Sequence, residues 1–224
     1  ASACLKPAMT LTHARRPEAG SQRERILDAA TTLFAELGFE AMTMRKLGEA
    51  VGLDNSSLYR HVASKTDLAN AVLEQVFDDV LPLIEAVVHG SRPASLKAVE
   101  VLAAAAGGHF FDRPADARLM MHWIMSVGED GGGFSVSVPA SDTGRPGGRL
   151  LELLAGWLEG GVREGALRKH AVPDALIVLL GAILLRPATF GHLLSSLEPE
   201  RSRGAARDVW MAELRATVRG TFAP

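Results

Sequence analysis

Cysteine is almost absent from this 224-residue chain: Cys4 is the single one, so no disulfide can join two parts of one molecule. Such cysteine usage is typical of a reducing compartment, and we expect the cytoplasm. Long hydrophobic runs are also missing. The longest, residues 175–185, is shorter than the roughly 20 residues that a membrane span needs. We therefore expect a buried helix there and no membrane segment.

A strong excess of one charge is missing too. The net charge is −2, and the first 67 residues hold 9 basic and 8 acidic side chains. A nucleic-acid partner would have to be held by a few well-placed cations, because the overall field is not strongly basic. The patterns G-x-x-x-x-G-K, G-x-S-x-G, H-E-x-x-H and paired C-x-x-C do not occur. We therefore expect no enzyme, no cofactor and no metal site.

Leucine, alanine and valine dominate the apolar residues, and only 5% of residues are aromatic, which favours helices over strands. Apolar residues recur at helical spacing, and no convincing alternating strand pattern occurs. We predict an all-α fold. In the first third, the predicted helices run from Ser21 to Gly38, from Thr43 to Gly52, from Asp54 to His61, and from Ser64 to a bend or an end at Pro82.

Glycine and proline divide the rest of the chain in the same way. The stretch 128–148 is rich in glycine, serine and proline, and we predict a loop. Pro93, Pro114 and Pro173 each fit the first turn of a helix. The predicted helices cover residues 93–111, 114–127, 150–162, 173–197 and 205–219.

The second and third predicted helices are short and are joined by a turn, which is the layout of a helix-turn-helix. Gly48 would let the two helices pack closely, and Gly52 tolerates the positive φ that the turn needs. Asparagine, serine and arginine can bond base edges or phosphates, and a helix N-terminus offers N–H groups to phosphates. The third helix is therefore expected to read DNA with the side chains left exposed on it: Asn55, Ser56, Ser57, Tyr59, Arg60 and His61.

The order of these residues resembles a known family. T-M-R-K-L-G-E-A-V-G-L-D-N-S-S-L-Y-R-H-V-A-S-K-T-D-L (43–68), preceded by A-x-x-L-F-A-E-x-G-F (30–39), is similar to the DNA-binding signature of the tetracycline-repressor (TetR) family. The resemblance covers about the first third of the chain. It implies backbone contacts by Thr43, Tyr59, His61 and Lys65, base reading by Asn55, Ser56 and Ser57, and further DNA contacts by Arg45 and Arg60.

Two details lie outside that signature. Val62 stands where many members of the family have phenylalanine, a difference that affects packing more than DNA contact. The N-terminal arm, residues 1–20, carries His13, Arg15 and Arg16, which could reach the minor groove.

The resemblance also implies a two-fold dimer on double-stranded operator DNA, since helix-turn-helix proteins read two half-sites about one DNA turn apart. The helices at about 149–165 and 173–197 resemble the family's dimerisation pair, although burial within one subunit would also explain their apolar character. We therefore divide the chain into the arm, a helix-turn-helix head (21–67), and a helical ligand-binding and dimerisation domain (68–224).

Bulky apolar side chains are densest in H-F-F-D-R (109–113) and L-M-M-H-W-I-M (119–125), a mixture that suits an adaptable pocket and also an ordinary core. The resemblance implies a small hydrophobic effector that favours a conformation whose two heads no longer fit the DNA, with the helix from Ser64 as the lever. The residues expected to bind it are Phe77, His109, Phe110, Met121, His122, Trp123 and Met125.

These inferences predict a transcriptional regulator: a repressor that binds a palindromic operator as a dimer and releases it when a small molecule binds. Two alternatives remain open. A helical ligand-binding protein without DNA binding would share most of the pattern, and an enzyme would show turnover without DNA binding.

Overall fold

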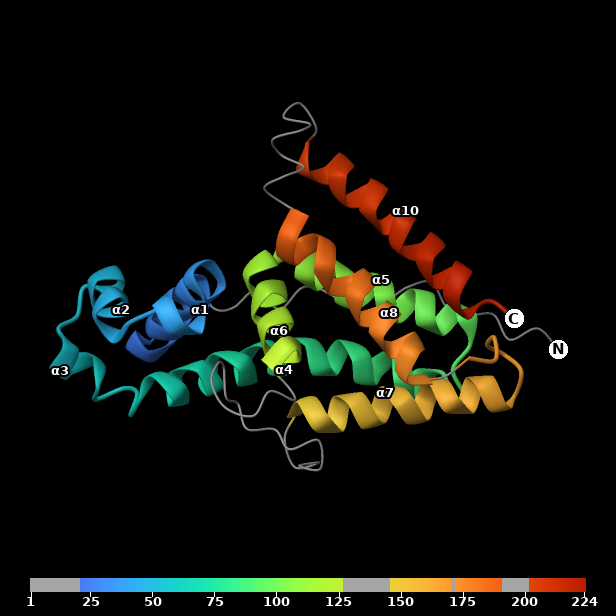
Figure 1. Ribbon diagram of the computed structural model, residues 1–224, viewed down its shortest axis with the longest axis horizontal. Helices are drawn as coiled ribbons and strands as arrows, with labels where there is room; N and C mark the ends of the chain where they lie inside the picture. The colour runs from blue at the N-terminus through green and yellow to red at the C-terminus, as the bar shows by residue number, and fades with distance from the viewer. Residues whose placement is uncertain (1–20, 127–145, 171, 191–201) are drawn as a thin grey trace.

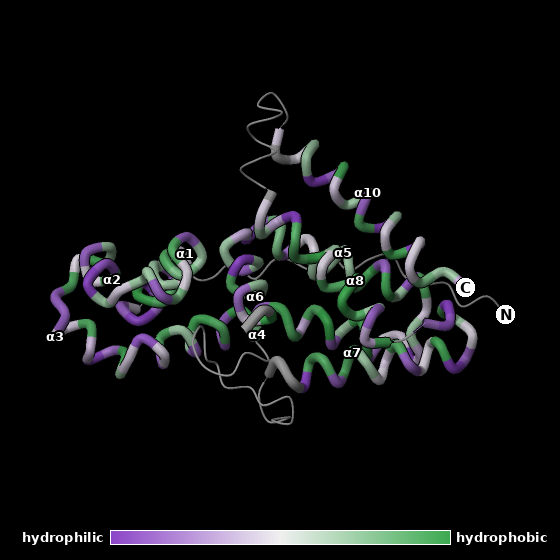
Figure 2. Tube along the Cα trace, in the orientation of Figure 1, coloured by the Kyte–Doolittle hydropathy of each residue, from purple (hydrophilic) through white to green (hydrophobic). Residues whose placement is uncertain are grey.

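The computed structural model describes residues 21–126, 146–170, 172–190 and 202–224. Every element in these ranges is a helix, and the all-α prediction is confirmed. Figure 1 shows the first three helices gathered at one end of the molecule, with α4 running from them into a larger helical body. Figure 2 shows that the tip of this end, around α3, is largely hydrophilic.

Three helices build the head: α1 (Gln22–Ala41), α2 (Met44–Val51) and α3 (Asn55–Leu58). Side-chain oxygens of the preceding residues, Ser21, Thr43 and Asp54, accept hydrogen bonds from the first-turn N–H groups, as the sequence predicts. The glycine expected to end α1 does interrupt it: Gly38 has a φ of 75°, and one further turn of helix follows it.

The helix α4 (Lys65–Gly90) joins the head to the body. It passes through Pro82, so of the two predicted outcomes, a bend or an end at this proline, the end is wrong. A proline removes only one helical N–H bond, and burial of an apolar face can hold the helix together on both sides of it. Val80 and Ile84 provide that burial here.

The body consists of α5 (Leu96–Asp112), α6 (Pro114–Ser126), α7 (Pro146–Arg163), α8 (Val172–Leu185) with its π-helical extension η1 (Arg186–Phe190), and α10 (Arg203–Phe222). Two starts differ from the prediction. The helix α5 begins after a Ser95 cap instead of at Pro93, because the Ser95 hydroxyl oxygen accepts from the N–H of Ala98 at 3.2 Å. The helix α7 begins at Pro146, inside the predicted loop, since proline fits a first turn.

The helix α5 lies at the centre of the body and packs against α4, α6, α8 and α10. Small residues let α10 approach it closely: a Cβ added to Gly107 would lie 2.8 Å from Leu214 and 2.9 Å from Trp210. The helix α6 packs against α1, and so connects the body to the head independently of α4.

The stretch Val172–Thr189, in α8 and η1, is long and apolar enough to cross a bilayer by length and composition alone. Of this window, 39% is buried inside the protein. A core helix meets the same criterion, so the stretch is weak evidence for a membrane segment. The predicted helix over 173–197 is described as far as Phe190, and its remaining residues lie outside the described ranges.

Candidate nucleic-acid interface

The head holds α2 and α3 in the predicted helix-turn-helix arrangement. Gly52 adopts the left-handed conformation with a φ of 70°, and the N–H of Leu53 donates to the carbonyl of Gly48 at 2.9 Å. A Cβ on Gly48 would lie only 2.6 Å from the Leu53 carbonyl oxygen, so a hydrogen side chain is required there. The anchor Leu58 of α3 is fully buried, which fixes the helix by its apolar side.

The polar side of α3 faces outward. Asn55, Ser56, Arg60 and His61 are exposed, Tyr59 is 51% exposed, and Ser57 is half-buried. The four-residue α3 ends at Leu58, and a hydrogen-bonded turn carries the chain on through His61. The side chains expected to contact DNA on this helix therefore share one accessible surface.

Asp54 organises the start of α3. Its carboxylate accepts from the Ser56 hydroxyl at 2.6 Å, and from the Ser57 N–H at 2.7 Å and hydroxyl at 3.0 Å. Arg60 donates in turn to the Ser57 hydroxyl oxygen at 2.9 Å. The hydrogen bond from Ser56, followed by those from Ser57, lowers the pKa of Asp54 from 3.8 to about 2, so the carboxylate is ionised throughout the neutral range.

This network determines whether Ser56 and Ser57 can donate or accept a hydrogen bond when they meet a partner molecule. A hydroxyl has one proton and two lone pairs. The protons of Ser56 and Ser57 are used on Asp54, so the groups left for a partner are oxygen lone pairs. In the major groove, the donors that such acceptors match are the exocyclic amino groups of adenine and cytosine.

Three further residues expected to contact DNA flank α3, and two of them, Thr43 and Lys65, are expected phosphate contacts. Thr43 is exposed, and its hydroxyl oxygen caps α2 by accepting from the Lys46 N–H at 3.3 Å. Arg45 is exposed and lies 3.7 Å from Glu49. The Lys65 ammonium lies 4.3 Å above the Phe39 ring and donates to the carbonyl of Glu40, in the last turn of α1, at 3.2 Å. It is thereby held at the edge of the same surface.

Two cations near this surface were missed by the sequence reasoning. The Lys46 ammonium donates to the Ala41 carbonyl at 3.0 Å, and Arg23 donates to the His61 carbonyl at 3.4 Å. Lys46 was detectable as a neighbour of the capping Thr43. Arg23 was not, because its contact spans 38 residues of sequence. The arm residues His13, Arg15 and Arg16 lie outside the described ranges.

The residues expected to bind an effector are distributed between core and surface. Phe77 and Trp123 are buried and pack edge to face, with ring centroids 5.3 Å apart. Phe110 is buried beside His109, whose Nε2 lies 3.3 Å from an Asp116 carboxylate oxygen. Met121 is half-buried, His122 is exposed, and the Met125 side chain lies outside the described part.

A hollow of about 570 Å³ lies elsewhere, between α7 and the segment that follows α4. Its lining includes Arg92, Glu152, Trp157 and Glu164, and none of the residues expected to bind an effector. The Trp157 indole N–H is satisfied nearby by the Ser91 carbonyl at 2.5 Å. The hollow is therefore a polar-rimmed feature separate from the aromatic cluster around Trp123.

Comparison with known sequences supports the interpretation of the head. Residues 26–72 match the family model of bacterial regulatory proteins of the tetR family. The chain is 41% identical over 59 residues to the HTH-type transcriptional repressor KstR2 of Rhodococcus jostii, which is 26% of this chain and 29% of that protein. It is 37% identical over 54 residues to the class D tetracycline repressor protein of Escherichia coli, 24% and 25% of the two chains. The matches thus span less than a third of these relatives.

Comparison with solved structures extends the similarity in fold to nearly the whole chain. KstR2 of Mycobacterium tuberculosis, a ketosteroid transcriptional regulator, superposes with a TM-score of 0.66 at 19% identity, over 91% of this chain and 96% of that one. AibR in complex with isovaleryl coenzyme A and operator DNA superposes with a TM-score of 0.69 at 14% identity, over 91% of this chain and 100% of that one. At these identities the likeness concerns the fold.

Proposed function

Because its head and its helical fold make this chain a member of the TetR family, we propose that it is a DNA-binding transcriptional repressor. The observation that carries the proposal is the surface of α3: an apolar side buried through Leu58, and an exposed polar side from Asn55 to His61. The relatives named as repressors favour this function over an enzyme or a helical protein without DNA binding.

We propose further that the repressor is a homodimer that pairs through α7 and α8. On α8, Ile177 is 68% exposed, Val178 42% and Leu185 45%. These residues recur at helical spacing with Gly181, beside which a Cβ would meet no atom within 4 Å. An unpaired apolar stripe of this kind marks an interaction surface, and a two-fold axis there would present two heads to one palindrome.

The test is selection of bound sequences from random double-stranded DNA by the purified chain. We expect an inverted repeat whose half-sites are centred about one helical turn, 10–10.5 base pairs, or a multiple of it apart. Recovery of no enriched sequence, together with no binding to non-specific DNA at low salt, would contradict the proposed function.

We propose that the DNA backbone is held by Tyr59 and Lys65. Lys65→Ala is expected to weaken binding to preferred and random duplexes alike, and to reduce the slope of log affinity against log salt by about 1. Fluorescence anisotropy at several salt concentrations measures the affinity for each duplex and the slope of log affinity against log salt. Lys169→Ala removes the same charge from an exposed position outside the head and serves as the control. An unchanged salt slope in Lys65→Ala would exclude Lys65 from the phosphate contacts.

We propose that Asp54 determines which bases Ser56 and Ser57 accept from. Asp54→Ala releases both hydroxyl protons, so each serine can also donate, and the preference for adenine or cytosine at the bases it faces should relax. Repeating the selection with this variant measures the change. Glu36→Gln, which removes one exposed negative charge from α1, is the control and should keep the same preferred sequence. An identical preference in Asp54→Ala would refute the assignment.

Above pH 3.8 the hydrogen bonds to ionised Asp54 stabilise the head, and they are lost as pH falls through about 2. The specificity that Asp54 imposes should therefore be constant from pH 5 to pH 8.

We also propose that a small hydrophobic effector binds in the body beside the Phe77–Trp123 pair. Phe77 belongs to α4. The first residue of this helix, Lys65, lies at the edge of the exposed surface of α3 that we propose reads DNA, the reading surface. An effector that displaces this aromatic pair would act on the helix that carries the head. Such an effector must bind the released conformation more tightly than the DNA-bound one.

A further inference from the structure

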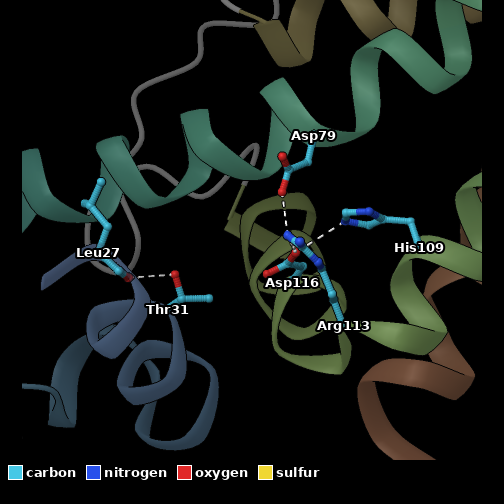
Figure 3. A network of polar contacts seen from close by, with 6 residues as sticks. All are labelled: Leu27, Thr31, Asp79, His109, Arg113 and Asp116. Carbon is cyan, nitrogen blue, oxygen red and sulfur yellow. Dashed lines mark hydrogen bonds and ion pairs between the residues drawn. The ribbon is translucent and has the colours of Figure 1, made fainter. Parts of the chain in front are cut away.

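A buried polar cluster joins three helices of the body at a distance from the reading surface (Figure 3). It contains Asp79 of α4, His109 of α5, Asp116 of α6, and Arg113 at the α5–α6 turn. His109 is 8% exposed and Asp116 2% exposed, whereas Asp79 and Arg113 are each about a quarter exposed. Charged groups are rarely buried to this extent unless they are paired or bind an ion.

The cluster contains two carboxylates and one guanidinium. Arg113 donates to Asp79 at 2.5 Å, and its nearest approach to Asp116 is 3.8 Å. The Arg113 guanidinium therefore faces two carboxylates, and it forms its short ion pair with Asp79, the more exposed of the two. Asp116, the most deeply buried, is left with His109 as its neighbour. A metal ion bound between these two side chains would give Asp116 a charged partner.

Two ligand-type atoms point at one another without forming a hydrogen bond. The Nε2 atom of His109 and the Oδ2 atom of Asp116 are 3.3 Å apart, and neither atom has a hydrogen-bond partner among the described residues. Tetrahedral zinc sites with metal–ligand distances of about 2.0–2.1 Å have ligand atoms about 3.3–3.4 Å apart. The observed separation is thus that of two adjacent ligands around one such ion.

The third ligand is also within reach. A carboxylate oxygen of Asp79, Nε2 of His109 and a carboxylate oxygen of Asp116 all lie within 4.8 Å of one another. We propose that these three side chains form a site for a divalent transition metal of the zinc type, with water completing a tetrahedron. One imidazole and two carboxylates supply nitrogen and oxygen ligands that this class of ion accepts.

Arg113 is the internal competitor of the metal. Its guanidinium occupies the space in front of Asp79, so Asp79 must exchange Arg113 for the metal when the ion binds. Arg113 therefore lowers the affinity of the site, and it keeps the carboxylate of α4 neutralised without an ion. This site could not be predicted from sequence, because its ligands come from three helices and follow no metal-binding spacing.

The test measures metal binding by the full chain without a histidine tag and without DNA, so that it is independent of the proposed function. Zn²⁺ alone is titrated into chelator-treated protein by calorimetry, and Co²⁺ alone is followed by its visible absorption. We expect one equivalent of either ion per chain and the intense bands of tetrahedral Co²⁺. Absence of a stoichiometric site in the wild-type chain would overturn the proposal.

Variants then assign the ligands. His109→Gln and Asp116→Asn should each weaken binding more than about 10-fold, since even the loss of an outer partner of a metal ligand costs 10–100-fold. His89→Gln and Asp78→Asn make the same chemical changes at exposed positions of α4 and should bind as the wild type does. Undiminished binding in both His109→Gln and Asp116→Asn would place the metal elsewhere and overturn the site.

Arg113→Ala should change the affinity for Zn²⁺ in the opposite direction to the ligand variants. Removing the competing guanidinium should tighten Zn²⁺ binding, because Asp79 then no longer has to give up Arg113 when the ion binds. This outcome does not depend on whether the ligand variants fold, and circular dichroism on each protein verifies the fold. Weaker binding in Arg113→Ala would show that the arginine supports the site and would contradict its role as competitor.

Discussion

Replacing Gly161 with alanine will destabilise the body, whereas the same replacement at Gly156 in the same helix will stabilise it. A Cβ on Gly161 would lie 2.4 Å from the Ala94 carbonyl oxygen and 2.8 Å from Leu167. The first of these is a backbone atom that cannot rotate away, and overpacking of this kind costs about 1–3 kcal/mol. We expect the melting temperature to fall by about 2–4 °C for each kcal/mol.

Gly156 provides the matched control. A Cβ there meets no atom within 4 Å, so alanine gains helix propensity without a clash, worth about 0.5–1 kcal/mol. Thermal unfolding followed by circular dichroism at fixed protein concentration compares the two variants. Equal melting temperatures would show that α7 does not approach the Ala94 backbone as closely as the structure places it.

Replacing Gly48 with alanine will remove most of the DNA affinity while the body stays folded. The added methyl group would lie 2.6 Å from the Leu53 carbonyl oxygen, so α2 and α3 must move apart. At about 1–3 kcal/mol of strain or lost contacts, the affinity falls roughly 5- to 150-fold. Anisotropy titrations with the selected duplex measure this loss.

The control for Gly48 is Ala50→Ser on the exposed side of α2, which should bind DNA as the wild type does. Far-ultraviolet circular dichroism of Gly48→Ala should retain the helical signal, because the body helices do not contact this position. Full affinity in Gly48→Ala would mean that the head tolerates a wider angle between α2 and α3 than its packing indicates.

The sequence predicted local features of the fold well, since their causes are local. Ser21, Thr43 and Asp54 cap helices because a side-chain oxygen reaches an N–H group two or three residues away. Gly52 forms the turn because it adopts a positive φ easily. Whether Pro82 ends the helix could not be decided from sequence, because the outcome depends on burial of the surrounding helix, which a local pattern does not reveal.

Contacts between distant residues were beyond sequence reasoning. Arg219 donates to Glu100 at 2.5 Å across 119 residues, and Asp79 meets Arg113 across 34. Neither pairing has a periodic signal. The polar face of α3 was predictable, but the Asp54 network that orients its serines was not, because hydroxyl orientation depends on the local three-dimensional arrangement.

The unbroken course of α4 has a mechanical consequence. From Asp79 to Lys65 the helix spans 14 residues, or about 21 Å at 1.5 Å per residue. A tilt of about 5° around Asp79 would displace Lys65 by about 2 Å, which is enough to break a hydrogen bond of ordinary length. Angular changes too small to alter the packing of the body are thus magnified at the far end of the helix into displacements on the scale of a DNA contact.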